Sequence, residues 1–185
     1  MESISDNAIM LKVKSGDLNK LGILFERYNR MLFGFFYRIT SNRELSEDLV
    51  QNLFIRILKY RKNFHGDGKF TTWMYTIARN ILADHFKQNK RKGFNIELTE
   101  AHENLNDNAL DLELEEDKHQ LLKKAMNRLE SEKLELLILS RYQGLKYREI
   151  AEIMNSSEGA IRVKIFRALN DLREHYVKLE KSESL

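Results

Sequence analysis

The sequence contains no cysteine and no proline, and only eight of its 185 residues are glycine. Without cysteine the chain forms no disulfide and offers no thiolate ligand to a metal, which fits a reducing compartment. Without proline, and with little glycine, long helices run without interruption. No segment shows the sustained alternation of apolar and polar residues that is typical of a strand. An all-α fold is therefore expected.

Long apolar runs are also absent. The longest, such as Met31 to Phe36, are far shorter than the about 20 residues that a membrane-spanning helix needs. Glu2 and Asp6 precede any apolar stretch, unlike in a secretory signal peptide. Hydrophobic residues make up 42% of the sequence, which is enough for packed cores. We therefore expect a soluble, cytoplasmic protein with one large or two small helical domains.

Charge is unevenly distributed along the chain, although the formal net charge is only +3. Residues 79–92 include five basic residues and one acid, whereas residues 93–117 include nine acids and no lysine or arginine. The C-terminal segments are basic again. This layout predicts two modules that face nucleic acid, residues 1–92 and 118–178, separated by an acidic linker, residues 93–117. Dense like charge and few large apolar residues predict that the linker is flexible and mostly extended.

The segment from Lys146 to Leu172 predicts two helices joined by a tight polar turn. Asn155 tolerates the left-handed conformation that ends a helix, and Ser156 or Ser157 is suited to cap the next one. The second helix has one apolar stripe, formed by Ile161, Ile165, Leu169 and Leu172.

The opposite face of this second helix has an aromatic residue between two arginines. Steps of about 100° per residue bring four side chains onto that face, Arg162, Val163, Phe166 and Arg167. Such a face suits a helix in the major groove of DNA, where guanidinium groups contact guanine edges or phosphates and apolar groups contact thymine methyls. An ordinary helical hairpin with a basic outer face is the alternative.

The N-terminal module begins with a short predicted helix, Asp6 to Ser15, which Gly16 ends. Asp17 is expected to cap a second helix with a continuous apolar face, and Asn42 to start a third. The third helix is apolar over more than half of its circumference, through Leu45, Leu49, Val50, Leu53, Phe54, Ile57 and Leu58.

Two explanations of this wide apolar surface stay open. Burial in the core accounts for it, and so does a second, docked protein. Asp48 and Gln51 lie beside the extra apolar stripe and favour a docking surface.

A glycine-bearing loop, Phe64 to Phe70, precedes a fourth predicted helix that Thr71 or Thr72 is expected to cap. One line at the edge of its core stripe contains Trp73, Asn80, Asp84 and Lys87. Such an edge stacks on unpaired bases and hydrogen-bonds them, while the basic residues that follow hold phosphates. Taken alone, the pattern is explained better by a core tryptophan beside solvated polar groups.

Three ordered motifs give the chain a strong resemblance to the extracytoplasmic-function sigma factors, the small bacterial initiation factors of RNA polymerase. The motifs are residues 48–51, residues 70–80 and the C-terminal helix-turn-helix, and the resemblance extends from about Ser15 to Arg173. It implies a region 2 helical bundle that docks on core polymerase and melts and reads the single-stranded −10 element. It also implies a region 4 helix-turn-helix domain that reads the −35 element as duplex. A further implied partner is an anti-sigma factor that can hold the protein at the inner face of the membrane.

The resemblance assigns roles to residues in three groups. The polymerase-docking group is Asp48, Gln51 and Phe54. The −10 group is His65, Gly66, Asp67, Lys69, Trp73, Asn80, Asp84 and Lys87. The −35 group is Arg162, Val163, Lys164, Phe166 and Arg167.

Two features of the resemblance leave alternatives. Val163 stands where a small polar residue is more usual, and Ser156 where an apolar turn residue is common, so the −35 sequence stays open. In related factors the linker enters the channel that RNA later occupies. The acidic linker here therefore either imitates the charge of RNA or is a plain tether.

Other functional classes fit less well. The five histidines show no metal-ligand spacing, and the sequence has neither a nucleophile elbow nor a phosphate-binding loop. We expect no enzymatic activity, metal, cofactor or small-molecule substrate. The competing hypothesis is a ligand-responsive helix-turn-helix regulator, which would dimerise to place two recognition helices one DNA turn apart. Such a regulator would bind duplex DNA unaided, whereas a sigma factor would be a monomer that needs polymerase.

Overall fold

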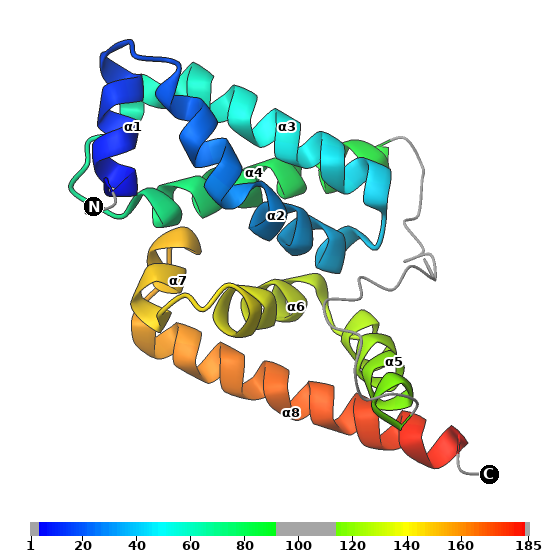
Figure 1. Cartoon of the computed structure of the whole chain (residues 1–185). Coiled ribbons are helices and arrows are strands. Elements are labelled where there is room, and N and C mark those ends of the chain that lie inside the picture. The colour runs from blue at the N-terminus through cyan, green and yellow to red at the C-terminus, as the bar shows by residue number, and fades with distance from the viewer. Residues whose placement is uncertain (1–3, 92–113, 184–185) are drawn as a thin grey trace.

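The computed structural model describes residues 4–91 and 114–183, and every regular element in these ranges is helical. The first range contains α1 (Asp6–Ser15), α2 (Lys20–Thr40), α3 (Arg43–Tyr60), a 3-10 turn η1 (Arg61–Asn63) and α4 (Phe70–Arg91). The second contains α5 (Leu114–Asn127), α6 (Ser131–Leu137), a π-helical turn η2 (Ile138–Tyr142), α7 (Tyr147–Ile153) and α8 (Glu158–Glu183). Figure 1 shows the two groups of helices stacked on each other.

The predicted all-α class with two small helical domains is confirmed. Residues 92–113, which include most of the predicted acidic linker, lie outside the described residues. Helix α5 begins at Leu114, so the last four residues assigned to that linker are helical. Helix α8 continues to Glu183, beyond the predicted end of the second domain at residue 178.

Local capping residues set several helix boundaries as predicted. Gly16 ends α1 with φ 115°, in the left-handed region that favours glycine. Asn42 caps α3, because its Oδ1 accepts the Leu45 N–H at 2.9 Å. In the helix-turn-helix, Asn155 has φ 48°, and the Ser157 Oγ accepts an N–H of the first turn of α8 at 3.2 Å.

Other predicted caps are wrong. Asp17 lies before α2 and does not cap it, because the N-cap position of α2 is Asn19. Thr71 and Thr72 lie inside α4, whose first amide is capped by a residue of α1. That cap is 63 positions away in the sequence, so no local pattern could reveal it.

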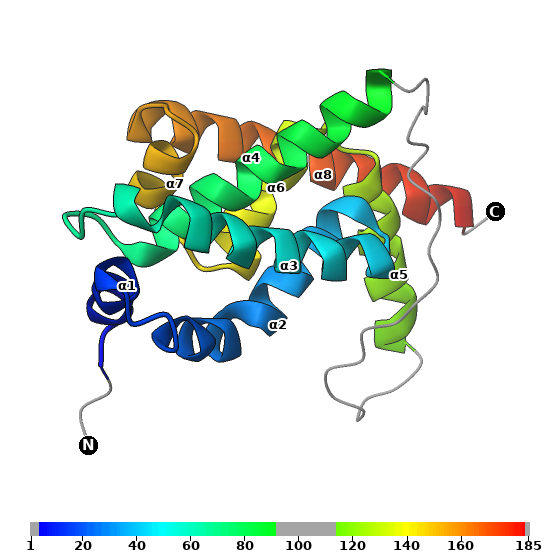
Figure 2. The same cartoon turned by 90° about the horizontal axis from the view of Figure 1, so that it is seen from above.

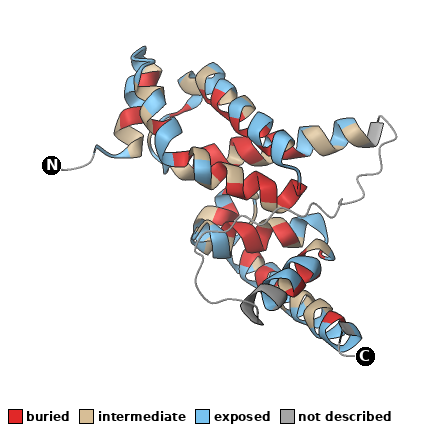
Figure 3. Ribbon diagram, turned by 45° about the vertical axis from the view of Figure 1, so that its right-hand side comes forward, coloured by how far each residue is buried: buried red, intermediate tan, exposed pale blue. Residues whose placement is uncertain are grey.

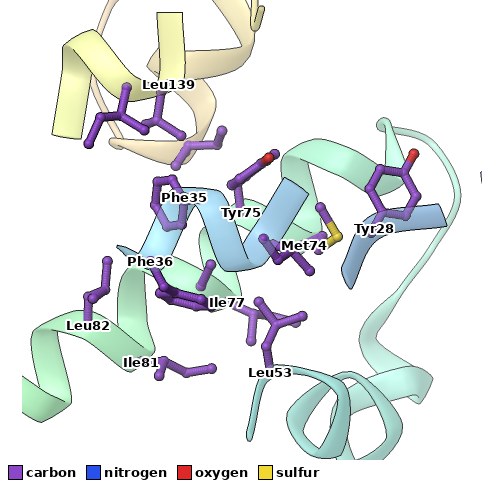
Figure 4. Packing of buried hydrophobic residues seen from close by; sticks show 14 of the residues in the cluster. Tyr28, Phe35, Phe36, Leu53, Met74, Tyr75, Ile77, Ile81, Leu82 and Leu139 are labelled. Carbon is purple, nitrogen blue, oxygen red and sulfur yellow. The ribbon is translucent and has the colours of Figure 1, made fainter. Parts of the chain in front are cut away.

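Helices α1–α4 form a bundle around an aromatic and aliphatic core. Phe35, Phe36, Leu53, Met74 and Tyr75 are buried side by side at its centre (Figure 4). The core fixes α3 and α4 against each other, so it also fixes the surfaces that these two helices present to solvent.

The two domains pack directly on each other. Helix α4 lies against α7, and α2 lies against α6 and η2. Leu139 of η2 is fully buried and lies beside Phe35 and Tyr75 of the first domain (Figure 4). Figure 3 shows buried residues continuing from one group of helices into the other. The predicted pair of tethered domains is thus held as one packed body.

The π-helical turn η2 makes part of the contact between the two domains. The turn is wider than an α-helical turn, because the Gln143 N–H donates to the Ile138 carbonyl, five residues earlier, at 3.0 Å. Sequence periodicity predicts an uninterrupted α-helix from Glu132 to Gln143, so this turn was not foreseen. Leu139 lies in this turn and Gln143 directly follows it, and both contact the first domain.

Polar contacts accompany the apolar ones across this interface. They are the hydrogen bond from the Tyr75 hydroxyl to the Gln143 Oε1 at 2.6 Å, the ion pairs Lys69–Glu149 at 2.8 Å and Arg79–Glu135 at 3.4 Å, and Arg38 over the Tyr142 ring with its Cζ 4.4 Å from the centroid. Burial raises the pKa of Tyr75, which keeps its hydroxyl a donor. Burial also acts to raise the pKa of Glu149, but the Lys69 ammonium and the Lys146 amide outweigh it and hold that pKa below its usual range.

Candidate nucleic-acid interface

The −10 and docking residues predicted from the sequence all lie on the first domain, and the −35 residues all lie on α8. In both views α1 lies at one end of the molecule and α5 lies at the other (Figures 1 and 2). The glycine-bearing loop between η1 and α4 contacts α1 and α7, so it lies at the α1 end.

The outer face of α3 carries Asp48 and Gln51, both exposed. Phe54, which the sequence assigns to the same docking face, is only 7% exposed and packs edge-on against Phe25 at 4.9 Å between centroids. Phe54 therefore belongs to the core. Ile55, which is 65% exposed, is the apolar residue on this face and was missed. Ile55 lies seven residues, or two helical turns, after Asp48, and this spacing could have placed it on the same face from the sequence.

Residues 65–69 form an exposed loop with only Gly66 partly covered. Gly66 has φ 85°, which favours glycine at this position. The loop is held from α1. The Asn7 Nδ2 donates to the Gly66 carbonyl at 3.2 Å and to the Gly68 carbonyl at 2.7 Å. The Lys14 Nζ donates to the Phe64 carbonyl at 2.6 Å.

Trp73 lies where the loop meets α4. It is half-buried, with its ring centroid 5.3 Å from that of Phe64 and 6.3 Å from that of Phe70. Because these two phenylalanines flank the loop, their contacts bring the loop and the tryptophan together. The structure thus places an aromatic face beside a concentration of exposed backbone and polar groups.

The polar edge of α4 continues from Trp73 along the helix. Asn80, Asp84 and Lys87 are all exposed on it, as their spacing predicts. Asp84 is not an isolated carboxylate, because its Oδ2 lies 2.9 Å from the Arg56 Nη2 of α3. This ion pair ties the polar edge of α4 to the helix that carries Gln51 and Ile55.

Lys69 also has a partner, Glu149 of the second domain. The ion pair joins the loop to the first helix of the helix-turn-helix. A phosphate would share or replace this carboxylate as a partner of the Lys69 ammonium. The packed arrangement therefore occupies part of the predicted −10 surface.

The outer face of α8 is exposed as predicted. Ile161, Ile165 and Ala168 are buried, and the opposite side presents Arg162, Val163, Phe166 and Arg167. Phe166 is 64% exposed and Val163 49%. Exposing an aromatic side chain to water between two guanidinium groups is unfavourable in the free protein. In a DNA groove the same side chain gains apolar contacts.

Lys164 is paired with another helix, whereas the Arg162 Nη2 lies 3.5 Å from the Glu158 Oε1 within α8 itself. The Lys164 Nζ lies 2.6 Å from the Glu132 Oε1 of α6, and Lys133 makes a similar 2.7 Å pair with Asp171 of α8. The two pairs fix the orientation of α8 on α6. We therefore regard Lys164 first as a residue that orients the exposed face.

Within residues 4–91 and 114–183, no histidine, aspartate and glutamate side chains gather in threes as a metal site would require. Over the same residues, no helix combines the length and the apolar character that a membrane crossing needs.

Comparison with known families gives two matches. Residues 24–92 match the model of sigma-70 region 2, and residues 119–172 match the model of sigma-70 region 4. One match falls on each of the two packed groups of helices, with α1 outside the first match, and together they cover most of the chain.

Proteins that are similar over about nine tenths of this chain are also sigma factors. The chain is 32% identical over 178 residues to the ECF RNA polymerase sigma factor BldN of Streptomyces coelicolor, covering 91% of this chain and 66% of that protein. It is 28% identical over 176 residues to the ECF RNA polymerase sigma-E factor of Haemophilus influenzae, covering 90% of this chain and 93% of the relative.

A solved structure extends the agreement to the fold. The sigma factor RpoE of Bartonella quintana, in complex with the anti-sigma factor NepR, superposes with a TM-score of 0.70 at 26% identity, covering 83% of this chain and 94% of that chain. Neither domain alone amounts to 83% of this chain, so the superposition includes parts of both. The chain therefore belongs to the ECF sigma factors of the sigma-70 family.

Proposed function

We propose that this protein docks on core RNA polymerase through α3, opens and reads the −10 element with residues 65–69 and α4, and reads the −35 element with α8. The observation that carries the proposal is that two different surfaces, each of a composition that suits nucleic acid, lie on two domains of one chain. One has an aromatic side chain beside polar groups and suits unpaired bases. The other is an exposed basic and apolar helix face that suits a major groove.

The protein needs no catalytic residue in this role. Polymerase performs the chemistry, and the sigma factor supplies recognition. We place the protein in the cytoplasm, where its polymerase and promoter partners are found, without a cofactor or a small-molecule substrate. Promoter-directed transcription with purified core polymerase tests the proposal.

Simultaneous reading of both promoter elements requires the two domains to separate. The −10 and −35 elements are about 25 base pairs apart, which at about 3.4 Å per base pair is about 85 Å. In the packed body Lys69 lies 2.8 Å from Glu149, and Glu149 precedes Arg162 by 13 residues (162 − 149). Even a fully extended chain of that length spans at most about 45 Å. The packed form therefore cannot reach both elements at once.

The packed form also indicates how the protein is kept inactive. The Bartonella quintana sigma factor, which shares an arrangement extending over both domains, was solved with an anti-sigma factor bound. We propose that an anti-sigma factor binds this chain in the same packed form and opposes separation of the domains. Polymerase would favour the separated form, because its contacts with α3 and α8 replace those between the domains.

The docking surface gives a first prediction. Replacing Gln51 and Ile55 together by alanine should lower the affinity for core polymerase, because both side chains are exposed on one face of α3. Stability should hardly change, since neither is part of the core. The measurement is core binding by fluorescence anisotropy of labelled sigma factor, with thermal unfolding followed by circular dichroism.

The matched control is Phe54→Ala. This buried side chain should cost about 3–5 kcal/mol of stability when truncated. Undiminished core binding by the Gln51/Ile55 double variant would remove α3 from the docking surface. Weaker binding by Phe54→Ala alone, without loss of stability, would return Phe54 to it.

A further inference from the structure

We propose that Asn7 is a positioning residue for promoter opening. It lies on α1, outside the segment that matches sigma-70 region 2, and it holds the −10 loop and the start of the reading helix α4 in one arrangement. The inference rests on the proposed −10 role of residues 65–69. It adds a residue to which neither the sequence motifs nor the family match assigns a role.

The side-chain amide of Asn7 matches the backbone groups that surround it. Both of its N–H groups are used, one on the Gly66 carbonyl at 3.2 Å and one on the Gly68 carbonyl at 2.7 Å. Its Oδ1 accepts the Phe70 N–H at 2.8 Å. One amide therefore holds two loop carbonyls and caps the first turn of α4. Among the standard side chains of this length, only asparagine offers donors and an acceptor together.

The loop needs such support because its own sequence provides little. Gly66 and Gly68 lose more conformational freedom on folding than other residues would. Gly68 has nothing within 4 Å of the position where a Cβ would stand. The first amides of α4 have no partner within the helix. Without Asn7, both the loop and the helix start would exchange between conformations.

Helix α1 is a rigid base for this support. Ile9, Met10 and Val13 are buried in the bundle, so α1 is fixed by packing. Lys14 donates to the Phe64 carbonyl at 2.6 Å, which fixes the other end of the loop. Hydrogen bonds from α1 thus reach the loop region at Phe64, Gly66, Gly68 and Phe70.

This support bears on base reading through Trp73. The indole packs between Phe64 and Phe70, whose backbones are the two ends that α1 fixes. Movement of either end would shift the indole face relative to the exposed loop groups. A displacement of that kind weakens base stacking without removing any group that touches the base.

Two substitutions separate positioning from stability. Asn7→Asp keeps an oxygen to accept the Phe70 N–H, and its charge suits a helix N-terminus. It loses both donors and places a carboxylate against two carbonyls. Asn7→Ala loses the cap as well. Ser5→Ala is the matched control, because the Ser5 Oγ caps α1 by accepting the Ala8 N–H at 3.3 Å and touches no part of the loop.

The experiment uses the full chain bound to core polymerase on promoter DNA. Promoter opening is measured by permanganate reactivity of −10 thymines, complex formation by gel shift, and stability by thermal unfolding. We expect Asn7→Asp to reduce opening about five- to thirtyfold, with complex formation unchanged and a Tm close to that of the wild type. Asn7→Ala should lose opening and Tm together. Ser5→Ala should lower Tm and open promoters normally.

Trp73→Ala and Asn80→Ala serve as reference variants in the same assay. If they impair opening while Asn7→Asp opens promoters like the wild type, the positioning role is wrong and the −10 surface stands. If promoter opening falls in parallel with Tm in every variant, Ser5→Ala included, Asn7 acts only on stability and the positioning role is wrong. If all variants open promoters normally, the −10 surface is misplaced and the inference fails with it.

Discussion

Covalent linkage of the two domains is expected to abolish promoter-directed transcription. In the packed form the chain from Glu149, the ion-pair partner of Lys69, to Arg162 spans at most about 45 Å, whereas the promoter elements are about 85 Å apart. A chain that cannot open reads at most one element at a time. The chain has no cysteine, so two introduced cysteines are the only thiols.

Arg38 and Tyr142 are suited to this linkage. The Arg38 Cζ lies 4.4 Å from the Tyr142 ring centroid, across the domain interface, and Tyr142 is 44% exposed. Neither has a predicted role in binding DNA or polymerase. Arg38→Cys with Tyr142→Cys, joined by a reducible bis-maleimide, should give no promoter-specific transcript. Reduction of the linker should restore the transcript.

The single-cysteine variants, treated with the same reagent, control for modification alone. Normal transcription by the linked protein would mean that the packed form engages a promoter as it stands. In that case the interface at Tyr75–Gln143 and Lys69–Glu149 would persist in the initiation complex.

Loss of either exposed arginine of α8 is the second large effect that we expect. Arg162→Ala and Arg167→Ala should each cost about 1–3 kcal/mol of promoter binding, roughly a five- to 150-fold loss of −35-dependent transcription. Both side chains lie on the face opposite the buried stripe, and Arg162 is 69% exposed. Binding to core polymerase should not change, which anisotropy measures independently.

Lys164→Ala is the neighbouring control. Its ammonium is paired with Glu132, so its loss should have a smaller effect that is similar for all −35 sequences. An arginine variant that transcribes normally from a −35-dependent promoter would have no reading role. A larger loss at Lys164 than at both arginines would move the reading surface toward α6.

Local signals in the sequence predicted much of this architecture. Asn42 and Asn155 determine their own turns through short-range geometry, and the buried stripe of α8 follows from its period. The exposed face with Phe166 follows from the same period. Where a residue depends only on its neighbours along the chain, periodicity and capping rules were sufficient.

Features that depend on distant residues could not be predicted in the same way. Phe54 and Ile55 are adjacent and both apolar, and packing in the bundle core, Phe25 of α2 included, buries Phe54 while Ile55 stays exposed. Asn7 caps a helix that begins 63 residues later. Part of the contact between the domains is made by the widened turn η2, which the residue pattern did not predict.

Transcription from genomic DNA by purified core polymerase, with and without this protein, tests the sigma assignment most directly. The start sites are mapped by sequencing 5′ ends, and the oligomeric state of the free protein is measured by light scattering. We expect a monomer that, with core polymerase, produces transcripts from a limited set of sites sharing −35 and −10 elements, which neither component produces alone. A dimer that binds duplex DNA unaided and adds no start site to core polymerase would contradict the assignment.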